Sequence, residues 1–138
     1  MDVDKEKSST QPPETRWSID LDWYQQNNRS FSALSQGCLC PKCKQRLSVE
    51  GKEVSVDSLL TTIKDCCSHV PGYITDQLPI LESVFRLFLA NGNQPLYIEE
   101  LSRQLTEWRN DDAYRTSMEM LPRLIDNEQY YGLRPTKD

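Results

Sequence analysis

The sequence of 138 residues has no run of about 18 apolar residues, the length that a membrane-spanning helix requires. Its first residues also lack the apolar stretch of a secretory signal. These absences predict a cytoplasmic protein that does not contact a membrane. In a reducing compartment, clustered thiols serve as metal ligands or redox groups more often than as disulfides. In a cytoplasmic protein, the five cysteines are therefore expected to be metal ligands or redox groups before disulfides.

Sequence features of common catalytic sites are scarce. The chain has one histidine, no glycine-rich phosphate loop, no Gly-x-Ser-x-Gly motif and no carboxylate pair whose spacing forces proximity. The paired acids Glu99-Glu100 and Asp111-Asp112 instead suit the positive end of a helix dipole. We therefore expect that the protein is not an enzyme and has no small-molecule substrate.

Positive charge is also in short supply. The formal net charge is −5, and residues 78–138 alone contain ten acidic and seven basic side chains. Proteins that gain affinity by neutralising phosphates normally carry a basic surface. The charge balance therefore argues against a strong binder of nucleic acid in general.

The length fits one folding unit with a small additional lobe. Residues 1–15 are mostly Ser, Thr, Pro, Gln and charged types, which bury too little apolar surface to offset their ordering, so a disordered tail is expected. Residues 16–77 are predicted to form a helical metal-binding lobe. Residues 78–138 are predicted to form a second module that packs with the lobe as one unit.

Apolar periodicity predicts mainly helices in the first of these regions. Two short helices are expected between residues 17 and 37, separated at Asn27-Asn28, because cap-forming Asp and Ser residues precede apolar ones. A polar strand or loop is expected over residues 47–56. The next helix is capped by Ser55 or Asp57, and its apolar face comprises Leu59, Leu60, Ile63 and Cys67.

The second region begins with the strongest helix signal in the chain, over residues 79–90. Its apolar residues follow the 3.6-residue period until Asn91-Gly92 supplies a left-handed stop. An extended piece at 95–97 precedes a second helix, and a third helix is expected to begin near Asp112. That third helix should direct Tyr114, Met118, Leu121 and Ile125 inward, ahead of a turn at 126–128 and a strand at Tyr130, Tyr131 and Leu133.

The cysteines gather in two segments, CLCPKC at 38–43 and CCSH at 66–69. Two cysteines separated by two residues on a tight turn direct both sulfurs at one ion, and Pro41 presets the backbone angle there. The pattern resembles the knuckles of zinc fingers and zinc ribbons. A structural zinc is therefore predicted, and its candidate ligands are Cys40, Cys43, Cys66, Cys67 and His69.

The fourth ligand remains open at this point. His69 shares a helix face with Cys66, whereas Cys67 is equally suited if the helix ends before it. Cys38 is taken as the spare cysteine. No acid or base lies near the knuckle in the sequence, so a closed structural site is expected rather than a catalytic one. The alternatives are that Cys66 and Cys67 are simply buried apolar residues, or that the knuckle is a redox pair.

About 60 of the 138 residues, carried by LPILESVFRLFLANGNQPLYIEELSRQLTEW and AYRTSMEMLPRLIDNEQYYGLRP, resemble a winged helix-turn-helix. The resemblance implies that PLYIEELSRQL is the first helix of the helix-turn-helix, residues 113–125 the recognition helix and residues 126–134 the wing. Pro122 departs from the pattern, because proline inside a helix removes a hydrogen bond. Acidic residues that would face phosphates depart from it too: Asp111, Asp112, Glu119, Asp126 and Glu128.

Six basic residues are candidates for contacting nucleic acid or another partner. Three lie on or next to the cysteine knuckle and three belong to the presumed recognition helix and wing: Lys42, Lys44, Arg46, Arg115, Arg123 and Arg134. The simpler interpretation is that the lysines near the knuckle are solvated surface residues.

The sequence thus predicts a mainly helical fold with a small zinc-stabilised lobe and a winged-helix-like C-terminal module. The leading hypothesis is an adaptor or regulator that acts in transcription or another nucleic-acid-linked complex and binds a protein partner, with nucleic acid as a further partner. One alternative is a pure protein–protein interaction subunit of a larger assembly. A weaker alternative is a thiol redox or metal sensor.

Overall fold

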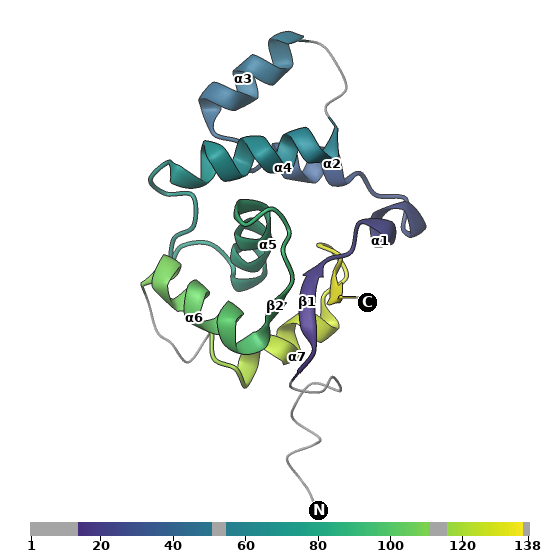
Figure 1. Ribbon diagram of the computed structural model, residues 1–138, viewed down its shortest axis with the longest axis vertical. Coiled ribbons are helices and arrows are strands. Elements are labelled where there is room, and N and C mark those ends of the chain that lie inside the picture. The colour runs from purple at the N-terminus through teal and green to yellow at the C-terminus, as the bar shows by residue number, and fades with distance from the viewer. Residues whose placement is uncertain (1–13, 51–54, 111–115, 137–138) are drawn as a thin grey trace, which may run out of the picture.

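The apolar helix α5 (Ile80–Ala90) lies at the centre of the fold and contacts α4 (Val56–Asp65) and α6 (Ile98–Arg109) (Figure 1). The computed structural model describes residues 14–50, 55–110 and 116–136. The remaining elements in these ranges are β1 (Arg16–Ile19), α1 (Leu21–Gln26), α2 (Phe31–Gln36), α3 (Pro41–Glu50), the 3-10 turn η2 (Cys67–His69), β2 (Leu96–Tyr97), α7 (Met120–Asn127) and β3 (Leu133–Pro135). The expectation of a mainly helical chain is confirmed.

The predicted end of α5 at Ala90 is also confirmed, and the helix begins one residue later than predicted, at Ile80. Pro79 caps its start with an extended backbone, and Gly92, with φ of 74°, turns the chain after its last residue. Seven of its side chains are buried, among them Phe85 and Phe88, which are 1% and 0% exposed. A helix that is apolar on most of its surface must be covered on several sides. The apolar surface of α5 therefore explains why this helix lies at the centre of the fold.

A three-stranded antiparallel sheet lies beside these helices, in the order β2-β1-β3. β1 comes from the N-terminal region and takes the middle position, with Trp17 opposite Leu96 and Ile19 opposite Leu133. The sequence does not predict β1, because four residues give no clear two-residue alternation. The Asn93 side chain supports this strand, accepting the N–H of Ile19 at 2.8 Å and donating to its carbonyl at 3.0 Å.

The interpretation of residues 47–56 as a strand or loop is wrong for residues 47–50, which belong to α3, and for Val56, which begins α4. Residues 51–54 lie outside the described part of the chain, as does most of the predicted tail at 1–15. Ser55 and not Asp57 caps α4, since its hydroxyl accepts the N–H of Ser58 at 3.1 Å. No helix within the described residues is long and apolar enough to cross a membrane.

The third helix of the C-terminal region begins later than predicted, at Met120. Residues 116–119 form turns, and the Met118 side chain, expected to point inward, is 51% exposed. Tyr114 and Arg115 lie outside the described residues. Because the helix starts at Met120, Pro122 falls in its first turn, where no intrahelical bond needs the missing N–H. Pro122 therefore removes no hydrogen bond from the helix and does not interrupt it.

The prediction that Glu128 faces outward toward phosphates is also wrong, because its side chain faces the protein interior. Its residue is 6% exposed, and its carboxylate accepts the N–H groups of Tyr130, Tyr131 and Leu133 at 2.8, 2.6 and 2.7 Å. Arg134 adds an ion pair at 3.1 Å. The expected strand at Tyr130 and Tyr131 is therefore a bend held by one carboxylate, and β3 begins only at Leu133.

We expect Glu128→Gln to lower the free energy of unfolding by about 1–3 kcal/mol, because an amide nitrogen would then face the donors that the carboxylate now accepts. Urea unfolding followed by circular dichroism measures this change. Glu99→Gln is the matched control, since Glu99 is exposed and should change stability by less than about 0.5 kcal/mol. Equal effects of the two substitutions would contradict the structural role of Glu128.

Candidate metal centre

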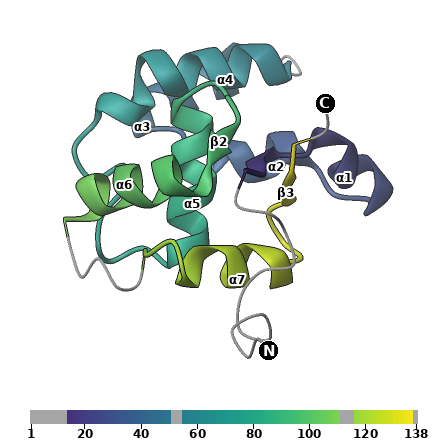
Figure 2. The same ribbon diagram turned by 60° about the horizontal axis from the view of Figure 1, so that its bottom comes forward.

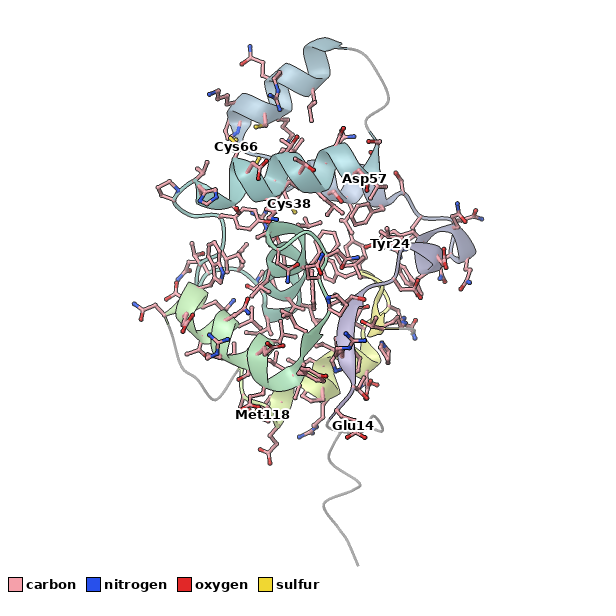
Figure 3. The ribbon with its side chains drawn as sticks, in the orientation of Figure 1. Glu14, Tyr24, Cys38, Asp57, Cys66 and Met118 are labelled. Atoms are coloured by element: carbon pink, nitrogen blue, oxygen red, sulfur yellow. The ribbon has the colours of Figure 1, made fainter. Side chains whose placement is uncertain are left out.

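Four cysteines from two distant segments meet where α3 begins and α4 ends. Cys40 directly precedes α3, and Cys43 lies in its first turn. Cys66 is the C-cap residue of α4, and Cys67 is the first residue of η2. Figure 3 shows sulfur atoms gathered at this junction beside the labelled Cys66. Cys40 is thereby brought together with Cys66 and Cys67, which lie 26 and 27 residues later in the sequence.

The sulfur positions fit a single metal ion. The four Sγ atoms all lie within 4.8 Å of one another, with Cys40 at 3.5 Å from Cys67 and 4.0 Å from Cys66. Four sulfurs bound tetrahedrally at about 2.3 Å would be about 3.8 Å apart. A disulfide needs a distance of about 2.05 Å, and all five cysteines are free. The cluster could therefore hold a metal ion.

The end of α4 explains which cysteines take part. The helix stops at Asp65, and Cys66 has φ of −129° and ψ of −64°, outside helical geometry. The divergence of about 100° between adjacent helical residues therefore does not apply, and both Cys66 and Cys67 reach the cluster. His69 is exposed and lies outside this group.

Cys38, the predicted spare, also lies outside the group of four. It is 8% exposed, and burial raises the pKa of its thiol to about 11. A buried thiol with a raised pKa is a poor nucleophile and a poor ligand.

The four clustered thiols have unequal pKa values. The backbone N–H of Cys43 at the start of α3 lowers the pKa of Cys40 to about 7. Burial raises the pKa of Cys43 and of Cys67, and the hydrogen bond with Cys43 raises that of Cys66. A bound cation would be needed to hold all four groups as thiolates at neutral pH.

The predicted partner-binding residues do not form one surface. Lys42, Lys44 and Arg46 are exposed on α3, whereas Arg123 is exposed on α7 at the opposite end of the molecule (Figures 1 and 2). Arg134 pairs with Glu128 and stacks on Trp23, with its guanidinium carbon 5.5 Å from the ring centroid. Arg115 lies outside the described residues, and among the five that the structure describes, only the three on α3 share an element.

Comparisons with known protein families, with curated proteins and with solved structures found no match. No related protein therefore supports the resemblance to a winged helix-turn-helix. The chemistry of the site rests on the four cysteines and their surroundings.

Proposed function

We propose that Cys40, Cys43, Cys66 and Cys67 bind one structural zinc ion. The observation that carries this proposal is the mutual approach of all four sulfurs to within 4.8 Å. Four protein thiolates complete the tetrahedral coordination that zinc prefers and leave no position for substrate or water. Such a closed site favours a structural role over a catalytic one, in keeping with a protein that is not an enzyme.

The zinc ion would fix α3 to the rest of the protein. This helix packs only weakly against other elements, and among its residues with described side chains only Cys43 is buried (Figure 1). A helix with so little apolar surface gains little stability from packing. Coordination of Cys40 and Cys43 to the ion that also holds Cys66 and Cys67 supplies the missing attachment.

We infer a winged-helix-like arrangement for the C-terminal region, with one difference. The order α5, β2, α6, α7, β3 agrees with the element order expected for such a domain. However, β3 pairs with the N-terminal strand β1 and not with a neighbouring strand of a wing hairpin. The N-terminal region thus completes the sheet, which gives a reason why the two regions would work as one unit.

The proposed role is a zinc-stabilised adaptor or regulator in transcription or another nucleic-acid-linked complex. Its support is the position of Lys42, Lys44 and Arg46, which are all exposed on the helix that the zinc ion would hold. Phosphate contacts set the position and orientation of a protein on nucleic acid, and cations on a helix that is itself held in place suit that role. The paired Arg134 makes a weaker candidate for such contacts.

Titration with duplex DNA at two salt concentrations tests this role. Affinity should fall steeply as salt rises, and the double variant Lys42→Gln/Arg46→Gln should reduce the slope of log K against log salt by about 1.8, or 0.9 per lost phosphate contact. Lys64→Gln/Arg103→Gln is the matched control, since it removes one exposed lysine and one exposed arginine elsewhere. Equal slopes for the two variants, or affinity that does not depend on salt, would exclude phosphate binding by α3.

A protein–protein interaction subunit is the second candidate, favoured by an exposed aromatic side chain. Trp108 on α6 is 38% exposed and packs against Tyr73, with ring centroids 5.9 Å apart. It borders a cleft of about 410 Å³ whose walls come from α4, η2, α5 and α6. Tryptophan is enriched among the residues that dominate protein interfaces. In this role the zinc ion would keep η2 in place as one wall of the cleft.

A further inference from the structure

A separate cleft lies between the α1–α2 turn and the loop that joins α7 to β3. Its volume is about 400 Å³, and its lining comprises Tyr24, Arg29, Ser30, Ala33, Leu34 and Tyr130. Figure 3 labels Tyr24 near α1, away from the cysteines around Cys66. No cysteine lines the cleft, so its chemistry is independent of the metal centre.

Arg29 provides the charge of this cleft. Its guanidinium carbon lies 4.8 Å from the ring centroid of Tyr130 and 5.8 Å from that of Trp23. In the part of the chain that the structure describes, Arg29 has no ion-pair partner, whereas Arg86 and Arg134 pair with Glu82 and Glu128. A guanidinium held on aromatic faces keeps its N–H donors available for an anion.

The walls of the cleft are held in place before any ligand arrives. Gly132 packs so closely on the first wall that an added Cβ would lie 2.8 Å from Trp23 and 2.9 Å from Tyr24. The Tyr24 hydroxyl donates to the carbonyl of Tyr131 at 2.6 Å. On the second wall, Glu128 binds the N–H of Tyr130. A preformed site loses less conformational entropy on binding.

We propose that this cleft binds a peptide carboxylate together with an adjacent apolar side chain of a partner protein. The carboxylate pairs with Arg29, whose planar group matches it in a bidentate fashion, and the Ser30 hydroxyl can donate a further hydrogen bond. Ala33, Leu34 and the Tyr24 ring offer the apolar contact. A phosphate carries up to two negative charges, whereas a carboxylate carries one. The single positive charge of Arg29 therefore matches a carboxylate better than a phosphate.

The carboxylate has two possible sources, a free C-terminus or an acidic side chain. Four probes distinguish them when the 138-residue chain is titrated and amide NMR shifts of Ser30, Ala33 and Tyr130 are followed. They are N-acetyl-Leu-Phe with a free carboxylate, its C-terminal amide, N-acetyl-Glu-Phe amide and phenyl phosphate. We expect the free carboxylate to bind at least about tenfold more tightly than its amide, the change that one charge-assisted hydrogen bond supplies. Comparable binding of N-acetyl-Glu-Phe amide would assign the carboxylate to an acidic side chain.

Substitution of Arg29 separates this site from general charge effects. Arg29→Gln should weaken binding of N-acetyl-Leu-Phe or N-acetyl-Glu-Phe amide by about tenfold, whereas Arg123→Gln, which removes an exposed arginine on α7, should leave it unchanged. Equal binding of the amide and both carboxylate probes, equal loss in the two variants or tighter binding of phenyl phosphate would overturn the proposal. Zinc content measured on the same samples reports on the metal centre separately, because the cleft contains none of its ligands.

Discussion

Replacing Cys43 by Ser is expected to release the metal ion and to detach α3 from the end of α4. Cys43 is 3% exposed, and its sulfur belongs to a group of four that has no further described ligand to replace it. A structural zinc contributes about 10–16 kcal/mol to the folding of small zinc-finger peptides, so its loss should be the largest single effect available in this lobe. Elemental analysis should find one zinc per wild-type chain and nearly none in the variant.

Cys38→Ser is the matched control for this experiment. Cys38 is also buried and lies two residues before Cys40, but it is outside the group of four. It should therefore retain one zinc and lose only the modest stability expected of a buried thiol-to-hydroxyl change. Loss of zinc from Cys38→Ser to the same degree as from Cys43→Ser would refute the ligand assignment. A wild-type protein that folds fully without metal would refute the zinc proposal itself.

The first half of the metal centre could be predicted from the sequence because its geometry is local. Cys40 and Cys43 are three positions apart, and Pro41 between them sets the turn. The second half depends on where α4 ends. The sequence allowed a helix through Cys67 or an earlier stop, and only the non-helical backbone of Cys66 brings both adjacent cysteines to the cluster. A one-residue difference in a helix end, which periodicity does not resolve, decided between Cys67 and His69.

The central helix was predictable for a similar reason, since its period, its proline and its glycine stop all lie within fourteen consecutive residues. The remaining features join residues far apart in the chain. β1 is stabilised by Leu96 and by Leu133, and the Arg29 cleft needs Tyr130 from the other end of the chain. No local pattern encodes such pairings. Glu128 looked like an exposed turn residue because its partners are backbone N–H groups, which every sequence contains.

Truncation of Phe85 to Ala tests whether the regions 16–77 and 78–138 fold as one unit. Phe85 is 1% exposed, and its ring lies 6.2 Å from that of Phe31 in α2 and 5.2 Å from that of Tyr131 near β3. It thus connects the N-terminal helices with the C-terminal loop through the central helix. Loss of such a ring typically costs about 3–5 kcal/mol, a large part of the roughly 5–15 kcal/mol of a whole domain.

Thermal unfolding of the zinc-bound protein should be followed by two signals, circular dichroism for the helices and a chromophoric chelator for released zinc. If both regions depend on the core around Phe85, the two signals should show one common transition, and Phe85→Ala should lower both midpoints by the same amount. Phe85→Leu, which keeps most of the apolar volume, should shift them less. Two separate transitions, or a Phe85→Ala protein that keeps zinc release at the wild-type temperature, would mean that the metal-binding region folds independently of the C-terminal one.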